Sequence, residues 1–134
     1  MLRSEGERLS FVPLDSSLEE QIRDAFVNHD LSAFESLLAD NVRWGDDDNP
    51  RRCRGPSEVM ANFSRMMSAG VDADITELSS GTRGILCGLR VRWPEGMERR
   101  GDVDLYQVYR IVDGRITEIQ RFNDIESARE SAGI

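Results

Sequence analysis

The spacing of apolar residues changes once along this 134-residue chain, and that change constrains the fold more than any other feature. Up to Gly70, apolar side chains recur about every three to four residues, which is typical of amphipathic helices. From Val71 onward they alternate with polar side chains, as in strands that have one face in water. Helices followed by a run of antiparallel strands predict an α+β domain in which the helices cover one face of a twisted sheet.

Local signals divide the helical half into three segments. Ser16 and Glu19 have the spacing of a capping box at the start of a first helix. Asp30 is suited to cap a second helix, and Pro56 is suited to the first turn of a third. The sequence therefore predicts three N-terminal helices, with a short strand at residues 42–44 between the second and the third.

The Asp113-Gly114 pair is the clearest turn signal in the second half of the chain. A type I′ turn needs positive φ angles, which Asp and Gly adopt at low cost, and the flanking runs 102–111 and 115–123 are rich in β-forming residues. We therefore expect a β-hairpin here, followed by a short C-terminal helix from about Ile125.

A chain of this length is expected to fold around a single core. We assign residues 1–15 to an N-terminal arm and residues 16–134 to one domain. Cys53 and Cys87 lack the spacing of a disulfide framework, and the arm contains no apolar run of the kind found in signal peptides. The sequence thus predicts a reducing, cytoplasmic setting.

The ionisable residues exclude several kinds of chemistry and partner. All 17 basic side chains are Arg and His29 is the one histidine, so lysine Schiff bases and multi-histidine metal sites are excluded. A net charge of -8 argues against nucleic acid and anionic membranes as partners. The acidic run at residues 46–48 is followed by Pro50 and by no further ligand at the spacing of a calcium loop, which favours a solvated turn over a metal site. No metal and no cofactor are predicted.

Three segments carry a resemblance to a known family: NHDLSAFESLLADNVRW, CRGPSEVMANF and LYQVYRIVDGRITEIQRFND. Their order resembles that of the nuclear transport factor 2-like superfamily, and of its SnoaL-like, ketosteroid-isomerase-like members, over about residues 16–125. The resemblance implies a cone-shaped, curved antiparallel sheet packed against the three N-terminal helices, with a pocket inside the cone. The segments WGDDDNPRRCRG and QRFNDIESARESAGI also resemble a little-characterised, actinobacterial-type set of SnoaL-like proteins.

The resemblance does not carry over a reaction. The positions at which ketosteroid isomerases hold an acidic base, a tyrosine donor and a protonated aspartate match Trp44, Ile22 and Gln107 here. The last-strand aspartate of the limonene epoxide hydrolases matches Arg121, which has the opposite charge. The resemblance therefore implies a fold and a small-molecule pocket, while the activities found on this fold differ too widely to assign one.

Alternation along the penultimate strand places an amide and a phenol among aliphatic side chains on its drier face, which by resemblance lines the cone. The predicted ligand-binding residues are Ile22, Phe26, Trp44, Cys87, Leu89, Val91, Trp93, Val103, Leu105, Tyr109, Ile119 and Asn123. In the alternative, Tyr109 reaches solvent at the rim and Gln107 satisfies a backbone group, so that neither touches a ligand.

Three polar residues are predicted to be catalytic, namely Asp46, Gln107 and Arg121. Asp46 follows Trp44 at the expected pocket entrance and would act as general base, while Gln107, Tyr109 or Arg121 stabilises developing oxyanion charge. If Arg121 lies inside, it needs a carboxylate partner or an anionic ligand; a solvated or paired position at the rim is the alternative. His29 is assigned to a surface turn between helices, without a catalytic role.

The predicted function is that of a SnoaL-like protein of undetermined reaction, acting as an acid–base isomerase, lyase or hydrolase on a small molecule that is anionic or bears a carbonyl. The alternative is a non-catalytic ligand-binding or dimerisation module. Arg90, Arg92 and Asp104 fall on the outer face of the predicted sheet. Alternating charges of this kind suit a homodimer through that face, and a monomer with a salt-bridged exposed sheet is the alternative.

Overall fold

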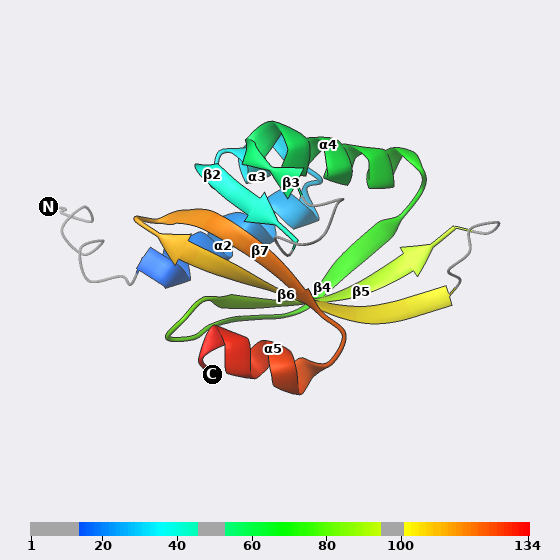
Figure 1. Cartoon of the computed structure of the whole chain (residues 1–134). Coiled ribbons are helices and arrows are strands. Elements are labelled where there is room, and N and C mark those ends of the chain that lie inside the picture. The colour runs from blue at the N-terminus through cyan, green and yellow to red at the C-terminus, as the bar shows by residue number, and fades with distance from the viewer. Residues whose placement is uncertain (1–13, 46–52, 95–100) are drawn as a thin grey trace, which may run out of the picture.

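The computed structural model describes residues 14–45, 53–94 and 101–134. Three of its helices lie on one side of a curved sheet and a fourth lies on the other side (Figure 1). The helices on the first side are α2 (Leu14–Val27), α3 (Leu31–Glu35) and α4 (Gly55–Ser68). The helix on the opposite side is α5 (Ile125–Ala132). None of the helices in the described ranges is long and apolar enough to span a membrane.

Six strands form the sheet in the order β3-β2-β7-β6-β5-β4. They are β2 (Leu38–Trp44), β3 (Cys53–Arg54), β4 (Asp72–Ser80), β5 (Ile85–Trp93), β6 (Gly101–Val112) and β7 (Arg115–Phe122). Neighbouring strands are antiparallel except for β2 and β7, which run parallel. The predicted α+β class is confirmed. The sheet is mixed rather than wholly antiparallel, because alternation in a sequence reports which face of a strand is wet and not which way its neighbour runs.

Two of the predicted turn and cap signals act as expected. The side chain of Asp30 accepts a hydrogen bond from the backbone N–H of Ala33 at 3.0 Å and so caps α3. In the turn between β6 and β7, Asp113 has φ 53° and Gly114 has φ 78°, the positive values that a type I′ turn requires. The short-range chemistry of the sequence therefore fixes both the α2–α3 corner and the last hairpin.

Of the three other helix starts, two agree with the sequence. Pro56 stands in the first turn of α4, and α5 begins at Ile125, as predicted. The first helix starts earlier than the capping box indicates, because α2 begins at Leu14 and Ser16 therefore lies within it. Helix ends commonly differ by one or two residues from the position of the capping signal.

Apolar side chains are buried on both faces of the sheet. The larger cluster lies between the sheet and α2, α3 and α4, and includes the fully buried Ile22, Val42, Val59, Ile85 and Ile119. The smaller cluster lies under α5 and contains Leu86, Val108, Ala128 and Ala132. The expectation that the strands are wet on their outer face is therefore wrong near α5, because this helix covers that part of β5 and β6.

Arg110 ties α5 to the sheet. Its guanidinium donates hydrogen bonds to the backbone oxygen and the Oγ of Ser131, both at 2.6 Å, to the backbone oxygen of Arg83 at 3.0 Å, and to Oε1 of Gln120 at 3.1 Å. These acceptors belong to α5, to the turn between β4 and β5, and to β7. Because charged donors make stronger hydrogen bonds than neutral ones, Arg110 holds the C-terminal helix in place on this face.

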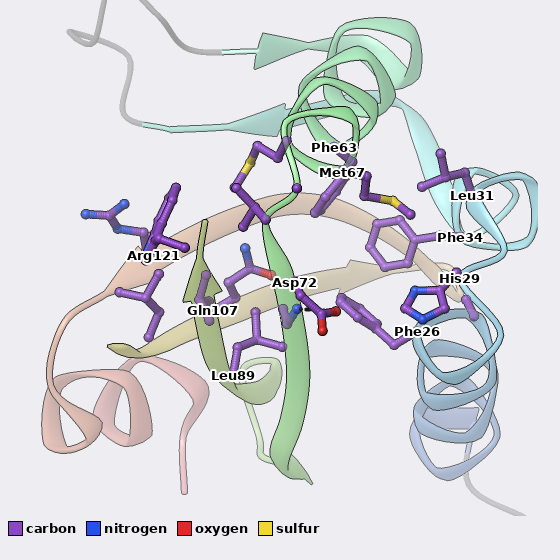
Figure 2. Close-up of a pocket in the computed structure, with 18 of the residues that line it drawn as sticks. Phe26, His29, Leu31, Phe34, Phe63, Met67, Asp72, Leu89, Gln107 and Arg121 are labelled. Atoms are coloured by element: carbon purple, nitrogen blue, oxygen red, sulfur yellow. Dashed lines mark hydrogen bonds between the residues drawn. The ribbon is translucent and has the colours of Figure 1, made fainter. Parts of the chain in front are cut away.

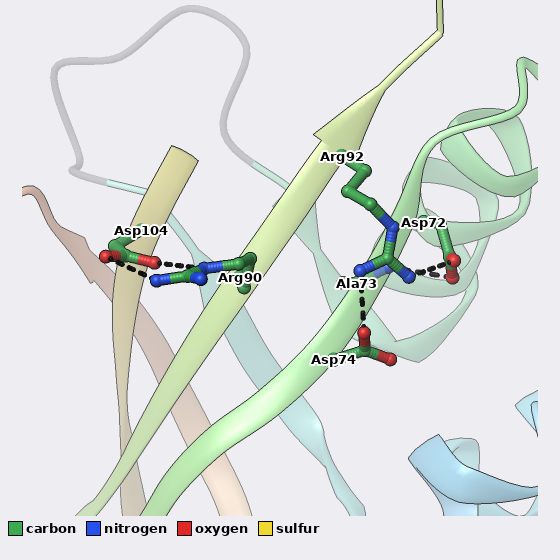
Figure 3. A network of polar contacts seen from close by, with 6 residues as sticks. All are labelled: Asp72, Ala73, Asp74, Arg90, Arg92 and Asp104. Atoms are coloured by element: carbon green, nitrogen blue, oxygen red, sulfur yellow. Dashed lines mark hydrogen bonds and ion pairs between the residues drawn. The ribbon is translucent and has the colours of Figure 1, made fainter. Parts of the chain in front are cut away.

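The rest of the outer face carries ion pairs within the chain (Figure 3). Arg90 on β5 pairs with Asp104 on β6 at 3.0 Å, and Arg92 pairs with Asp74 at 2.7 Å and with Asp72 at 2.5 Å. The side chains of these five residues are 41–63% exposed. Exposed pairs of this kind contribute only about 0–1 kcal/mol each, so they make the surface polar more than they stabilise the fold.

Candidate functional site

A cavity of about 370 Å³ opens on the inner side of the sheet, among α2, α3, α4 and strands β2 and β4–β7 (Figure 2). Its volume lies within the range of about 300–1,000 Å³ that is usual for small-molecule pockets. Most of its wall is apolar. The side chains that line it on the sheet include Ala73, Leu89, Val91, Trp93 and Leu105.

The helical wall of the cavity is built around Phe34 of α3. The ring of Phe34 makes edge-on contacts with Phe26, Phe63 and Tyr109, with centroids 5.7, 5.3 and 6.2 Å away. Trp44 of β2 lies against Phe63, with a centroid distance of 4.7 Å. Interlocked aromatic rings of this kind hold one another in place, so this side of the cavity has a fixed shape.

Gln107 of β6 is the buried polar residue at the floor of the cavity, with 6% of its surface exposed (Figure 2). Its Oε1 accepts a hydrogen bond from the hydroxyl of Tyr109 at 2.6 Å. This separation is typical of a hydroxyl that donates to a carbonyl oxygen. The NH₂ group of Gln107 therefore faces the cavity.

Tyr109 and Cys87 lie behind the floor and do not line the cavity. Both side chains are fully buried, and the Cys87 sulfur is a neighbour of the Tyr109 hydroxyl. Burial raises the pKa of Cys87 from 9.0 to about 12 and raises the pKa of Tyr109 well above 10. Both groups therefore keep their protons at neutral pH.

Arg121 of β7 lies beside Gln107 in the sheet register and borders the cavity. The residue is exposed, and Figure 2 shows its guanidinium at the edge of the cavity. Among the residues that the structure describes, none forms a hydrogen bond or ion pair with it. The structure thus places Arg121 at the rim of the cavity, where water can solvate it, and not in the interior.

A second polar region lies at the mouth, on the turn between α2 and α3 and at the start of β4. His29, Asp30 and Asp72 all border the cavity there. Asp30 is engaged in capping α3, and hydrogen bonding from Arg92 holds the pKa of Asp72 below its ordinary value. Asp72 therefore lacks the raised pKa that a general base of the kind predicted for Asp46 requires, and the carboxylate of Asp30 is occupied by its capping hydrogen bond.

The structure brings together about half of the residues that the sequence assigned to the site. Those that line the cavity are Phe26, Trp44, Leu89, Val91, Trp93, Leu105, Gln107 and Arg121. Those that lie behind its wall, fully buried, are Ile22, Cys87, Tyr109 and Ile119. The half-buried Val103 and the exposed Asn123 also do not line it. The proposed base Asp46 lies outside the described residues.

The sequence missed most of the helical wall and the mouth. His29 lies on the predicted turn but also borders the cavity, while Phe34, Phe63 and Met67 come from the helices (Figure 2). The apolar spacing that identified these helices is the same whether a side chain faces packed core or open cavity. Within the described ranges, no group of three or more His, Cys, Asp or Glu side chains is arranged to hold a metal ion.

Comparisons with known proteins give information about the fold that forms this site. A family model described as "SnoaL-like domain" matches residues 19–119. No curated protein matches the chain. An NTF2-like protein of unknown function from Burkholderia pseudomallei is 20% identical, with a TM-score of 0.65, over 92% of this chain and all of that one.

Two structures from Mycobacterium tuberculosis are similar at the same level. An LEH-like epoxide hydrolase is 19% identical with a TM-score of 0.62, and 89% of each chain is covered. A protein solved in complex with estradiol-17beta-hemisuccinate is 18% identical with a TM-score of 0.63, over 86% of this chain and 97% of that one. Likenesses at this identity show a common fold, and they establish neither a ligand nor a reaction.

Proposed function

Because the chain belongs to the SnoaL-like domain family, we propose that its cavity binds a small organic molecule with an apolar body and an oxygen that accepts a hydrogen bond from Gln107. One observation carries this proposal: the Gln107 carbonyl is occupied by Tyr109, so its NH₂ group is directed at the cavity. A ligand oxygen that enters the cavity can accept a hydrogen bond from this NH₂ group.

The proposal agrees with what is known of one fold relative. The Mycobacterium tuberculosis protein with estradiol-17beta-hemisuccinate has the same fold and holds a small organic ligand. A cavity of about 370 Å³ with aromatic and aliphatic walls suits a ligand built on fused rings. We place the ketone, ester or other acceptor oxygen of such a ligand at the floor, next to β6.

Acid–base catalysis remains our proposal for the reaction, with Asp46 as general base and with Gln107 and Arg121 stabilising negative charge on the substrate oxygen. Isomerisation, elimination and hydrolysis all fit this set. Ligand binding without catalysis is the second candidate. It is favoured by the engagement of both described carboxylates at the mouth, Asp30 with α3 and Asp72 with Arg92.

Gln107→Met is the variant that tests the floor donor. Methionine has nearly the same length but no N–H, so we expect 1-indanone, a two-ring ketone, to bind about tenfold more weakly to this variant than to the unchanged protein. Protein-detected NMR titration measures both dissociation constants.

The matched control is Gln21→Met, which makes the same change on the exposed side of α2. This variant should bind 1-indanone as the unchanged protein does. Equal affinity of Gln107→Met and Gln21→Met would contradict the assignment of Gln107 as the donor.

We also propose that the protein acts in the cytoplasm, whose reducing conditions suit the free thiols of Cys53 and Cys87, and that it forms a homodimer through the outer sheet face beside α5. Exposed Arg90 and Arg92 would exchange some of their partners across a two-fold axis. Size-exclusion chromatography with light scattering should then give twice the mass of the chain, and Arg90→Glu should shift it towards a single chain. A single-chain mass for the unchanged protein would contradict the dimer.

A further inference from the structure

We propose that Tyr109 is a positioning residue that makes the cavity floor a pure hydrogen-bond donor. The cavity would then select ligands that present an acceptor oxygen and reject ligands of the same shape that present an N–H. This inference rests on the proposed ligand-binding function and adds to it the polarity of the ligand that is accepted. Tyr109 acts through Gln107 and does not touch the ligand itself.

A glutamine side chain that nothing holds would not discriminate in this way. Its amide carries an acceptor oxygen and a donor NH₂ group on a nearly symmetric frame, and a half-turn of the last torsion exchanges them. Such a residue could donate a hydrogen bond from its nitrogen to a ketone or accept one at its oxygen from an amine. Selectivity therefore depends on what fixes the orientation of the Gln107 amide.

The hydroxyl of Tyr109 supplies that restraint. Gln107 and Tyr109 are two residues apart on β6, so both project from the same face, and Tyr109 Oη lies 2.6 Å from Gln107 Oε1. Tyr109 is fully buried, so water has no access to take over its hydroxyl. If the amide turned over, the hydroxyl would have to accept from Gln107 and pass its own hydrogen to the sulfur of Cys87, which is a weak acceptor.

Cys87 borders this pair from the neighbouring strand. It is the register partner of Gln107 across β5 and β6, and its buried sulfur is a polar neighbour of the Tyr109 hydroxyl. Because a thiol sulfur is a weak acceptor, it does not compete with the Gln107 carbonyl for the hydrogen of that hydroxyl. The hydroxyl therefore donates to Gln107, and the NH₂ group is left for the cavity.

This direction is stable over the physiological pH range. Burial keeps the pKa of Tyr109 well above its ordinary 10, so the hydroxyl keeps the proton that it donates to Gln107 near neutral pH. A ligand carbonyl, ether oxygen or phenolate facing Gln107 gains a hydrogen bond. A ligand N–H in the same place leaves two donors opposed, both without an acceptor, and such a mismatch weakens binding by about tenfold or more.

Three two-ring probes of similar shape test the inference: 1-indanone, which presents an acceptor, indole, which presents a donor, and indene, which presents neither. Titrations followed by protein-detected NMR give the three dissociation constants. For the unchanged protein we expect 1-indanone to bind about tenfold more tightly than indole, with indene between them. The side-chain NH₂ signals of Gln107 should shift with 1-indanone and stay nearly unchanged with indene.

Tyr109→Phe removes the restraint while keeping the ring in the core. The Gln107 amide can then turn its carbonyl to the cavity, so indole should bind more tightly and the preference for 1-indanone should fall to about twofold. The matched control is Tyr106→Phe, the same change on the same strand but in the half-buried position on the opposite face, near α5. That variant should keep the full preference.

The outcomes separate the two proposals. If Tyr109→Phe keeps the preference for 1-indanone, the role of Tyr109 is overturned and the ligand-binding function of the cavity stands. If none of the three probes binds the unchanged protein, the ligand-binding function itself is overturned. Should Tyr109→Phe not fold, as judged by far-ultraviolet circular dichroism, the unchanged protein decides. Equal affinity for indole and 1-indanone would then refute the inference, and the expected tenfold ratio, lost in Gln107→Met, would support it.

Discussion

Raising the pH from 9.0 to 12 is expected to remove about 3 kcal/mol from the free energy of unfolding through Cys87 alone, with a slope that reaches about 1.4 kcal/mol per pH unit between these two values. Burial raises the pKa of this thiol from 9.0 in the unfolded chain to about 12 in the fold. Above pH 9 the unfolded chain loses the proton while the folded protein keeps it. The stabilisation is therefore complete below pH 9 and is lost as the pH rises towards 12. Tyr109, whose pKa is also raised by burial, steepens the loss above pH 10.

Urea denaturation at a series of pH values measures this loss. In Cys87→Ala, the free energy of unfolding should fall less steeply in the first part of the pH series, because the buried thiol is removed. This variant starts from a lower stability. Cys53→Ala is the matched control, since Cys53 is only half-buried and its pKa is raised less. A free energy of unfolding that stays constant up to pH 11 in the unchanged protein would show that Cys87 reaches solvent and would contradict its place behind the cavity floor.

The fold was predictable because its local signals agree with one another. The cap at Asp30, the proline at the start of α4 and the Asp113-Gly114 turn each specify a backbone conformation within a few residues. The parallel pairing of β2 with β7 was not predictable in this way, because it joins segments far apart in the chain. The burial of Leu86 was not predictable either. Leu86 lies on the outer face of the sheet and is shielded from water only because α5 folds back over it.

The site was predictable on the sheet and much less so on the helices. In the strands, alternation separates the inward face, so Leu89, Leu105 and Gln107 were assigned correctly to the cavity wall. Periodicity says which face of the sheet is dry but not how deep a residue lies, and for this reason the buried Cys87 and Tyr109 were predicted to touch the ligand. Depth depends on the packing of several elements and is not encoded in the spacing of one.

Gln107 connects the sequence comparison with the geometry. The resemblance matched it to the position at which ketosteroid isomerases hold a protonated, donating aspartate. The amide can also donate, and unlike a carboxyl group it needs no raised pKa to do so. What the amide lacks is a fixed direction, and the hydrogen bond from Tyr109 supplies one. A donor at the floor of an apolar cavity is thus obtained from groups that are neutral at physiological pH.

Phe34→Ala is expected to lower the free energy of unfolding by about 3–4 kcal/mol, the cost typical of removing a buried aromatic ring together with its packing. Phe34 is 5% exposed, and its ring contacts those of Phe26, Phe63 and Tyr109. The residue stands between the core and the cavity, so its truncation both removes these contacts and extends the cavity towards Tyr109. Urea denaturation of the variant and of the unchanged protein measures the difference.

A cavity that has grown in this way should bind a small apolar molecule, which separates this loss from a general weakening of the fold. Benzene at a concentration well above its dissociation constant should restore part of the stability of Phe34→Ala, since a ligand that binds only the folded state stabilises it by mass action. Phe122→Ala, a truncation under α5 on the other face of the sheet, should gain less from benzene because it opens no space next to the cavity. A loss below about 1 kcal/mol for Phe34→Ala would contradict the central place of this ring in the helical wall.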